Sequence, residues 1–442
     1  MSLANDFQVF VERLIPDKLE EMNTTIGEIA KKLNKEYYNL DKEDKEHMYV
    51  VGSVGRGTAI KGVSDLDLIF DLPEDTYKKF DGYGENSNGQ SALLQEVKNI
   101  LKTRYPKTDI SGDGQVVVIE FTNYKVELVP GFRQKDDSFK YPNTHNGGSW
   151  KKTDPLPEIE ASKKMAEETN DIFTHICNML RAWKNNIGFK FGGLLIDSLV
   201  YKFLNENEEY KDIDYVDYFN MAKAVFEFLK GLDKEQTYWY ALGSNQQVYN
   251  CDNGKFITKA NKAYNIISLV TKWANFRKED EIDINERLGE IFGKEFPENE
   301  YLLESEYTVV ARRTEQFINQ ICSVDIKFNL KIDCEVTQDG YRPFYLRYML
   351  RHGILLKKNK SLKFEIQGSD VPGGVDSCDI YWKVRNVGDE ALRLIRGQVI
   401  KTNSDIHRER TSFRGAHYVE CYLVKNGVCI ARDKIEVPIS ES

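Results

Sequence analysis

The sequence predicts an α+β protein that ends in a small all-β domain. Segments with helical periodicity alternate with β-branched runs up to about residue 320, and short alternating runs separated by Gly or Asn turns follow residue 325. The chain has 442 residues, which favours two or three domains. We therefore expect a first domain over residues 1–160, a helical lobe over 161–325, and a sandwich-like β domain over 340–442.

Composition and charge exclude several classes of protein. Hydrophobic residues make up 41% of the chain, enough to form packed cores, and no run reaches the roughly 18–20 apolar residues of a membrane span. A net charge of −9 argues against a protein that coats nucleic acid. The start of the chain lacks a signal-peptide pattern, and the seven cysteines form no C-x-x-C pair. We expect a cytoplasmic protein with reduced thiols, no structural zinc and no membrane partner.

The elements follow from periodicity and from turn residues. Helices are predicted at 5–38 with a break at Pro16, at 91–105, across 158–230 and near 258–277, and strands at 115–121 and 125–129. The polar stretch 130–157, which is rich in Pro and Gly, is interpreted as a long connection.

Two carboxylates, Asp65 and Asp67, lie in the apolar run Asp65-Leu66-Asp67-Leu68-Ile69-Phe70. Side chains at i and i+2 of a strand share a face, so the two like charges would repel each other unless a cation bound them. Oxygen ligands in small number suit Mg²⁺, with Mn²⁺ as the alternative. Glu127, in the run Lys125–Val129, is the candidate third ligand. Three carboxylates on neighbouring strands can hold two metals for in-line attack on phosphorus.

A Gly-Ser turn precedes these carboxylates. Gly52 and Ser53 follow a short apolar run, where exposed backbone N–H groups and a hydroxyl could bind a phosphate. The order is G-S-x-x-x-G-T, then D-x-D seven residues after Thr58, then V-E-L-V. This combination resembles the nucleotidyltransferases related to DNA polymerase β and, more narrowly, the cyclic GMP-AMP synthase/DncV-like CD-NTases of bacterial antiphage signalling.

The resemblance covers residues 5–320 and implies a bilobal cage, in which a mixed sheet carrying Asp65, Asp67 and Glu127 faces a helical lobe. Glu127 stands where the family usually has Asp, and Glu120 is a weaker substitute because no comparable context surrounds it.

The resemblance also suggests nucleotide-binding residues in the helical lobe. Arg181 stands at the position of a family residue that reaches the donor triphosphate, and Lys184 is the alternative; a solvated basic helix face is the other interpretation. Tyr249, in the expected loop 246–250, is a candidate for stacking on a base. Arg56 and Thr58 are candidates for contact with the acceptor.

The C-terminal segment resembles the adenylyl/guanylyl and SMODS C-terminal sensor (AGS-C) domain. Its matching segments lie at 380–388, 394–398, 417–422 and 425–427. Their aromatic and basic residues could form a pocket for an anionic ligand, or Trp382 and Tyr418 could belong to the sandwich core. The basic and aromatic residues concerned are Trp382, Lys383, Arg385, Arg396, His417 and Tyr418.

The resemblance implies a Mg²⁺-dependent enzyme that converts nucleoside triphosphates, ATP and GTP foremost, into a cyclic di- or oligonucleotide. A separate effector would read the product. Two alternatives stay open: transfer of a nucleotide to a protein or tRNA, and a weakly active module that senses nucleotides.

Overall fold

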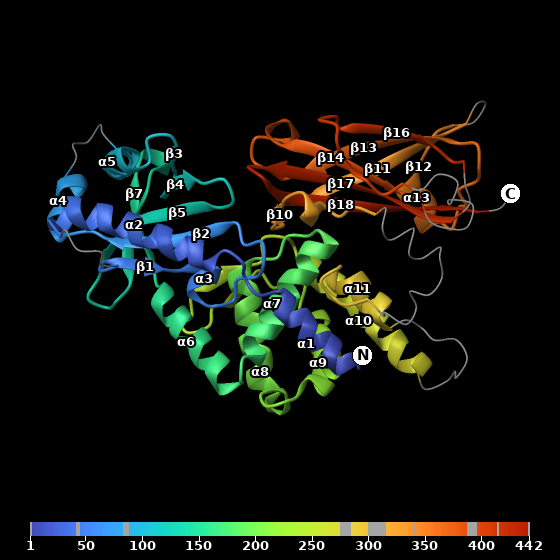
Figure 1. The fold of residues 1–442 in the computed structure, drawn as a ribbon, viewed down its shortest axis with the longest axis horizontal. Coiled ribbons are helices and arrows are strands. Elements are labelled where there is room, and N and C mark those ends of the chain that lie inside the picture. The colour runs from blue at the N-terminus through green and yellow to red at the C-terminus, as the bar shows by residue number, and fades with distance from the viewer. Residues whose placement is uncertain are drawn as a thin grey trace. The chain divides into compact units, whose positions relative to one another are not determined.

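The computed structural model describes residues 2–40, 45–82, 88–274, 284–298, 315–338, 342–386, 396–412 and 415–440. The chain divides into two compact units (Figure 1). The N-terminal unit contains residues 2–182 and 192–268, and the C-terminal unit contains residues 183–191 and the chain from residue 269 onward. The boundary expected near residue 160, between the first domain and the helical lobe, falls inside the N-terminal unit.

A mixed sheet organises the N-terminal unit. In the described part of the chain it has seven strands in the order β1-β2-β5-β4-β3, with β6 joined to β5 and β7 joined to β6. Strands β2 and β5 are parallel, and the other pairs are antiparallel. The bounds are β1 (Met48–Val50), β2 (Asp65–Asp71), β3 (Asp109–Asp113), β4 (Val116–Glu120), β5 (Lys125–Arg133), β6 (Phe139–Asn143) and β7 (Ser149–Thr153).

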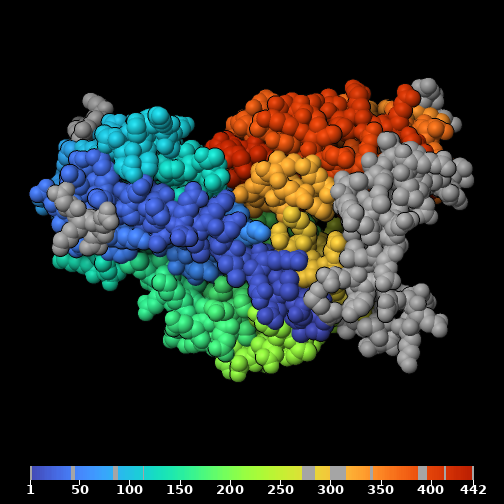
Figure 2. Space-filling view, in the orientation of Figure 1, coloured from blue at the N-terminus to red at the C-terminus, as the bar shows by residue number. Residues whose placement is uncertain are grey.

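The core of this unit lies on one face of the sheet. Helices α2 (Leu19–Tyr38) and α5 (Gly89–Arg104) bury their apolar positions against it, and Leu66, Leu68 and Phe70 of β2 belong to the same cluster. Figure 2 shows the blue N-terminal residues and the cyan residues after residue 88 as one continuous surface. Because alternate residues of a strand point to opposite faces, this packing directs Asp65 and Asp67 away from the core.

The predicted helices are confirmed, including the break at Pro16 between α1 and α2. Apolar residues on one side of each helix form its buried face. The remaining helices of this part of the chain are α1 (Leu3–Arg13), α3 (Gly52–Gly55), α4 (Glu74–Asp81), α6 (Pro155–Glu168), α7 (Ile172–Ile187), α8 (Gly193–Glu206), α9 (Tyr218–Lys230) and α10 (Lys255–Ala274).

Two segments expected to be irregular contain strands instead. The stretch 130–157 holds the end of β5, the strands β6 and β7, and the start of α6. The expected loop 246–250 contains β9 (Gln247–Tyr249), which pairs with β8 (Tyr238–Tyr240). Strands β7 and β9 are polar and largely solvent-exposed, so their sequences lack the apolar alternation by which a half-buried strand is recognised. Strand β6 is more buried, but its sequence Phe139–Asn143 contains a proline, which argues against a strand.

The C-terminal unit contains the predicted β-rich domain, and the α+β fold class is confirmed. In its described residues, one sheet has the order β10-β18-β17-β14-β15 and the other has the order β12-β11-β13-β16. Both contribute to one apolar core, so they pack as a sandwich. The bounds are β10 (Ser323–Val324), β11 (Leu330–Thr337), β12 (Phe344–Tyr345), β13 (Ser361–Ser369), β14 (Asp379–Arg385), β15 (Val399–Lys401), β16 (Ile406–Arg410), β17 (Gly415–Lys425) and β18 (Val428–Ile439). Helices α11 (Ile284–Phe292) and α13 (Leu346–Arg351) accompany them.

Membrane insertion by a helix is not indicated. Within the residues that the structure describes, none of the helices combines the length and the apolar character needed to cross a bilayer.

Candidate active site

The three predicted carboxylates lie on two adjacent parallel strands. In the register of β2 and β5, Asp67 is the partner of Glu127 and Asp65 is the partner of Lys125. All four residues are two apart along their strands, so they lie on the same face of the sheet. The structure therefore brings Asp65, Asp67 and Glu127 together on one face, as the spacing predicted.

The Gly-Ser turn lies directly beside Asp67. Gly52 begins α3 with a φ of +64°, and a Cβ placed on it would be 1.9 Å from Oδ2 of Asp67. The backbone N–H of Val51 donates to the carbonyl oxygen of Asp67 at 2.9 Å, which fixes the turn against the strand. Only glycine combines this φ with this close approach. The first N–H groups of a helix lack acceptors within it, so Gly52 and Ser53 supply donors beside the carboxylates.

Lys125 lies among these acidic groups and was missed by the sequence interpretation. Its ammonium group is bonded to Oε1 of Glu127, and it is 3.9 Å from Oδ1 of Asp65. It provides the positive charge that the clustered carboxylates require in the absence of another cation. The alternation Lys125-Val126-Glu127 was the available signal, because it places a cation on the face of the third carboxylate.

These residues fit a divalent metal ion in part. Among the described residues, no three His, Cys, Asp or Glu side chains converge to form a ready-made metal site. Asp65 and Asp67 nevertheless form the hard oxygen pair that Mg²⁺ prefers when substrate phosphates supply further ligands. The absence of a Cβ at position 52 makes room for the Asp67 carboxylate, whose Oδ2 lies where that Cβ would be. Glu127 is bonded to Lys125, so its role as third ligand stays a prediction.

A buried ion-pair network supports the segment that follows the Gly-Ser turn. Oδ2 of Asp197, on α8, accepts hydrogen bonds from Arg56 Nε and Thr58 Oγ1, each at 2.8 Å. Arg181 donates from Nη1 to Oδ1 at 2.6 Å and from Nη2 to Oδ2 at 3.0 Å. Burial alone would raise the pKa of Asp197, but Arg181 and Arg56 outweigh it and hold that pKa below its ordinary value.

This network changes the interpretation of three predicted residues. Arg181, Arg56 and Thr58 are all buried and bind Asp197. Their hydrogen bonds hold the segment after the Gly-Ser turn against helix α8. The prediction that Arg181 holds the donor triphosphate is not supported by this placement, because its guanidinium is already bonded to a buried carboxylate. The signal that sequence reasoning missed was Asp197 itself, a single carboxylate in the apolar segment Leu194–Val200.

Lys184 also has other partners. Its ammonium group donates to the carbonyl oxygen of Ile326 at 2.9 Å and lies 3.2 Å from Oδ1 of Asp325. The next residue, Asn185, bonds to the backbone of Val324 and Ile326. All of these residues belong to the C-terminal unit. Lys184 thus ties the end of α7 to that unit and is not available to the triphosphate in this conformation.

Tyr249 lies on β9 and is 60% exposed. Its hydroxyl donates to Oε1 of Gln247 at 2.8 Å, and its ring centroid is 6.1 Å from that of Tyr238. A ring in this position faces solvent and can receive a base, and its role in stacking stays a prediction.

Several residues expected to form a pocket in the C-terminal domain belong to its interior. Trp382 is buried and donates from Nε1 to the carbonyl oxygen of Ser404 at 2.9 Å, as in the core interpretation. Lys383 is buried and pairs with Glu315 at 2.7 Å and with Glu420 at 3.2 Å. These groups neutralise one another and do not form an open anion site.

The sheet, the Asp-x-Asp strand and the glycine turn beside it have the arrangement that the resemblance to nucleotidyltransferases implies. Comparison with known families agrees and is more specific. Residues 1–165 match the Second Messenger Oligonucleotide or Dinucleotide Synthetase domain, and residues 312–440 match the Adenylyl/Guanylyl and SMODS C-terminal sensor domain. The chain therefore carries a synthetase domain and a sensor domain of the kinds expected for a CD-NTase with an AGS-C domain, and these matches support a nucleotidyltransferase of the cyclic oligonucleotide synthase type. Proteins of this type generally use a divalent metal cofactor.

Individual relatives are distant. A probable cyclic nucleotide synthase from Bacillus cereus is 20% identical over 278 residues, which cover 56% of this chain and 82% of that protein. Among solved structures, CdnC of E. coli MS115-1 with ATP is 16% identical with a TM-score of 0.48, covering 66% of this chain and 98% of CdnC. A mutant of the Vibrio cholerae dinucleotide cyclase DncV is 11% identical with a TM-score of 0.47, covering 67% of this chain and 87% of DncV.

Proposed function

We propose that the chain joins nucleoside triphosphates into a cyclic di- or oligonucleotide in a Mg²⁺-dependent reaction. In each step, a ribose hydroxyl oxygen forms a bond to the α-phosphorus of a donor triphosphate. The bond from that phosphorus to the bridging oxygen breaks, pyrophosphate leaves, and the hydroxyl proton passes to solvent. The observation that carries this proposal is the register that places Asp65, Asp67 and Glu127 on one face of the sheet, with Gly52 against Asp67.

Each group has a distinct task in this proposal. Asp65 and Asp67 would hold the metal ion, and Glu127 would join them once released from Lys125. The bound metal would lower the pKa of the attacking hydroxyl and offset phosphate charge. The backbone N–H groups at Gly52 and Ser53 orient the β- and γ-phosphates of the donor. No protein nucleophile is required, because positioning and charge account for this kind of catalysis.

The product would act as a second messenger that a separate effector reads, in the antiphage role implied by the family resemblance. The choice of bases, the ring size and the linkage are fixed by contacts with the two nucleotides. Tyr249 is the proposed stacking residue, since its ring is exposed in the N-terminal unit.

The direct test incubates the purified full chain with all four labelled nucleoside triphosphates and Mg²⁺ or Mn²⁺. We expect a small phosphatase-resistant product, identified by mass spectrometry, together with pyrophosphate. The variant Asp65→Asn/Asp67→Asn should lose both signals while keeping its fold by circular dichroism. The matched control, Glu74→Gln/Asp75→Asn, removes two carboxylates from the start of α4 and should retain activity.

The other outcomes separate the alternatives. Label on a protein or tRNA would indicate nucleotide transfer to a macromolecule. Tight nucleotide binding without turnover under either metal would indicate a sensor module. Unchanged product formation by the double asparagine variant would refute the site.

A further inference from the structure

A group of exposed apolar side chains lies in the C-terminal unit, on the segment that leads from β12 through α13 to residue 358. We call residues 342–358 the exposed segment. Figure 1 shows α13 beside β11 and β12, at the edge of that sheet. A contiguous group of exposed apolar residues marks an interaction site, whereas single ones are ordinary. Six large apolar residues of the segment are at least 38% exposed: Phe344, Tyr345, Tyr348, Leu350, Ile354 and Leu355.

The exposed segment is fixed to the sandwich by its other side. Leu346, Met349 and Leu356 are buried in the apolar core. Arg347 donates from Nη2 to Oδ2 of Asp433 at 2.7 Å, which joins α13 to β18. The backbone is therefore held in place, and the side chains that point outward belong to a preformed surface.

The outward side combines rings with branched aliphatic side chains. The ring centroids of Phe344 and Tyr348 are 6.4 Å apart, and those of Tyr348 and His352 are 4.0 Å apart. Ile354 and Leu355 follow the end of α13, and Leu355 is 65% exposed. Aromatic rings beside aliphatic side chains are typical of surfaces that enter the boundary between lipid headgroups and acyl chains.

The exposed segment is also strongly basic. Residues 342–358 contain five Lys or Arg and no Asp or Glu. Arg342, Arg351 and Lys357 are exposed, and in the part of the chain that the structure describes none of them is paired with a carboxylate. On the nearby strand β13, Glu365 is already paired with Lys363 at 2.7 Å. The segment therefore keeps a net positive charge beside its apolar side chains.

This charge limits what can cover the exposed segment. A second copy of the chain would bring the same positive charge to the contact, and like charges across an interface oppose association. A protein partner would have to match the surface in shape, whereas a fluid bilayer adapts to it. An anionic bilayer is complementary in both respects, because its headgroups attract the cations and its interior accepts the apolar side chains.

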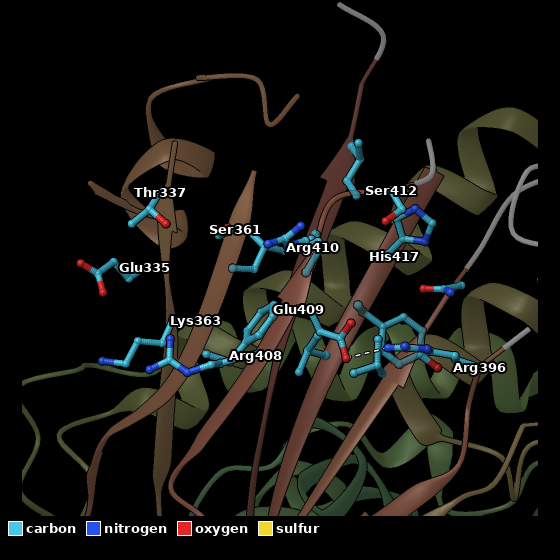
Figure 3. Close-up of a pocket in the computed structure, with 18 residues that line it drawn as sticks. Glu335, Thr337, Ser361, Lys363, Arg396, Arg408, Glu409, Arg410, Ser412 and His417 are labelled. Atoms are coloured by element: carbon cyan, nitrogen blue, oxygen red, sulfur yellow. Dashed lines mark hydrogen bonds and ion pairs between the residues drawn. The ribbon is translucent and has the colours of Figure 1, made fainter. Parts of the chain in front are cut away.

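The exposed segment is separate from the cavity of about 560 Å³ in the same domain, which Figure 3 shows. All six exposed apolar residues are among those that the structure describes, and none of them lines this cavity. Glu409 of the cavity lining pairs with Arg396 at 2.6 Å. Arg396, which the sequence interpretation assigned to a ligand pocket, is therefore already neutralised.

We propose that the exposed segment binds the surface of a bilayer that contains anionic lipids. Ile354 and Leu355 enter below the headgroups, while Arg351 and Lys357 contact the lipid phosphates. The sequence interpretation expected no membrane partner because no segment was long enough to span a bilayer, and binding at the surface requires no span. The proposal does not depend on the reaction proposed for the N-terminal unit.

The test is co-sedimentation of the purified full chain with lipid vesicles in EDTA, so that no divalent metal bridges protein and lipid. One set of vesicles contains phosphatidylcholine alone, and the other contains equal amounts of phosphatidylcholine and phosphatidylglycerol. We expect binding to the mixed vesicles that weakens as salt is added, and much weaker binding to phosphatidylcholine alone.

Two double variants separate the apolar and the electrostatic contributions. Ile354→Ser/Leu355→Ser should reduce the partition coefficient about tenfold, because two aliphatic side chains no longer enter the bilayer. Its matched control is Ile15→Ser/Val216→Ser, which replaces two exposed apolar residues of the N-terminal unit and should bind as the wild type does.

Arg351→Gln/Lys357→Gln should also reduce the partition coefficient about tenfold at low salt. Its matched control is Lys163→Gln/Lys164→Gln, which removes two exposed cations from α6 and should leave binding unchanged. Thermal unfolding of each variant will show that it is folded.

The remaining outcomes would overturn the proposal. These are absence of binding to the mixed vesicles, equal binding to both kinds of vesicle, and undiminished binding by either double variant. Self-association without vesicle binding, measured by light scattering and abolished by Ile354→Ser/Leu355→Ser, would assign the surface to a second copy. Binding of an acidic protein without vesicle binding, lost in the same variant, would assign it to a protein partner.

Discussion

Replacing Asp197 by alanine should destabilise the N-terminal unit strongly. The carboxylate accepts four short hydrogen bonds, two from Arg181 and one each from Arg56 and Thr58. Its removal takes away the buried carboxylate that pairs with Arg181, and leaves Arg56 with only the longer contact to Glu158 at 3.8 Å. Removing one partner of a buried pair typically costs about 3–5 kcal/mol, which corresponds to a fall of about 6–20 °C in Tm for a domain of this size.

Differential scanning calorimetry and urea unfolding of the full chain would measure this change. The matched control is Glu206→Ala on the same helix, whose exposed pair with Lys202 should contribute less than about 1 kcal/mol. Asp197→Asn keeps the shape of the side chain but loses its charge, and should fall between the two. If Asp197→Ala cost no more than Glu206→Ala, the buried network would not be a source of stability and the reasoning would fail.

Three other changes have defined outcomes. Gly52→Ala should reduce turnover about 100-fold, because a Cβ at that position would displace the turn from Asp67 by about 1 Å or more, which assays of pyrophosphate release would detect. Lys125→Met should tighten Mn²⁺ binding about tenfold, measured by electron paramagnetic resonance without nucleotide, because a competing cation about 4 Å from a carboxylate is removed. Burial would raise the pKa of Glu420, but Arg432 and other cations lower that pKa to about 2. The ionised carboxylate therefore stabilises the fold fully above about pH 4.5, and this stabilisation is lost as the pH falls toward 2. Urea unfolding of Glu420→Gln should therefore show a loss of about 3 kcal/mol at pH 7 that shrinks below pH 4.5.

Each change has a control. Gly57→Ala, at a glycine that also has a positive φ but open space around its Cβ position, should disturb turnover much less than Gly52→Ala. Lys151→Met removes an exposed cation from β7 and should leave Mn²⁺ affinity unchanged. A pH-independent effect of Glu420→Gln would contradict the low pKa of the native carboxyl.

The fold could be predicted where a segment has one buried face. The alternation Asp65-Leu66-Asp67-Leu68 specifies a strand with an apolar and an acidic face, and Pro16 marks the break between two helices. Strand β7 (Ser149–Thr153) could not be predicted in this way, because its side chains are mostly exposed and its backbone is ordered by pairing with β6. Pairing between segments leaves little trace in local composition.

The same distinction applies to the candidate site. Asp65, Asp67 and Gly52 were predicted because their spacing within a short segment already fixes their chemistry. Arg181 could not be placed correctly, because its partner Asp197 lies on the next helix and only the packing of α7 on α8 brings them together. Basic residues on a helix look alike in sequence whether they face a ligand or a buried carboxylate.

The contacts at the end of α7 determine where this chain can be divided for separate study. Lys184 and Asn185 take their hydrogen-bond partners from residues 324–326, which precede most of the β-sandwich. A truncated fragment ending before Ser323 would leave the ammonium of Lys184 without its acceptors in an apolar setting, and the last turn of α7 would fray. A fragment intended to report on the synthase alone should therefore extend through Ile326.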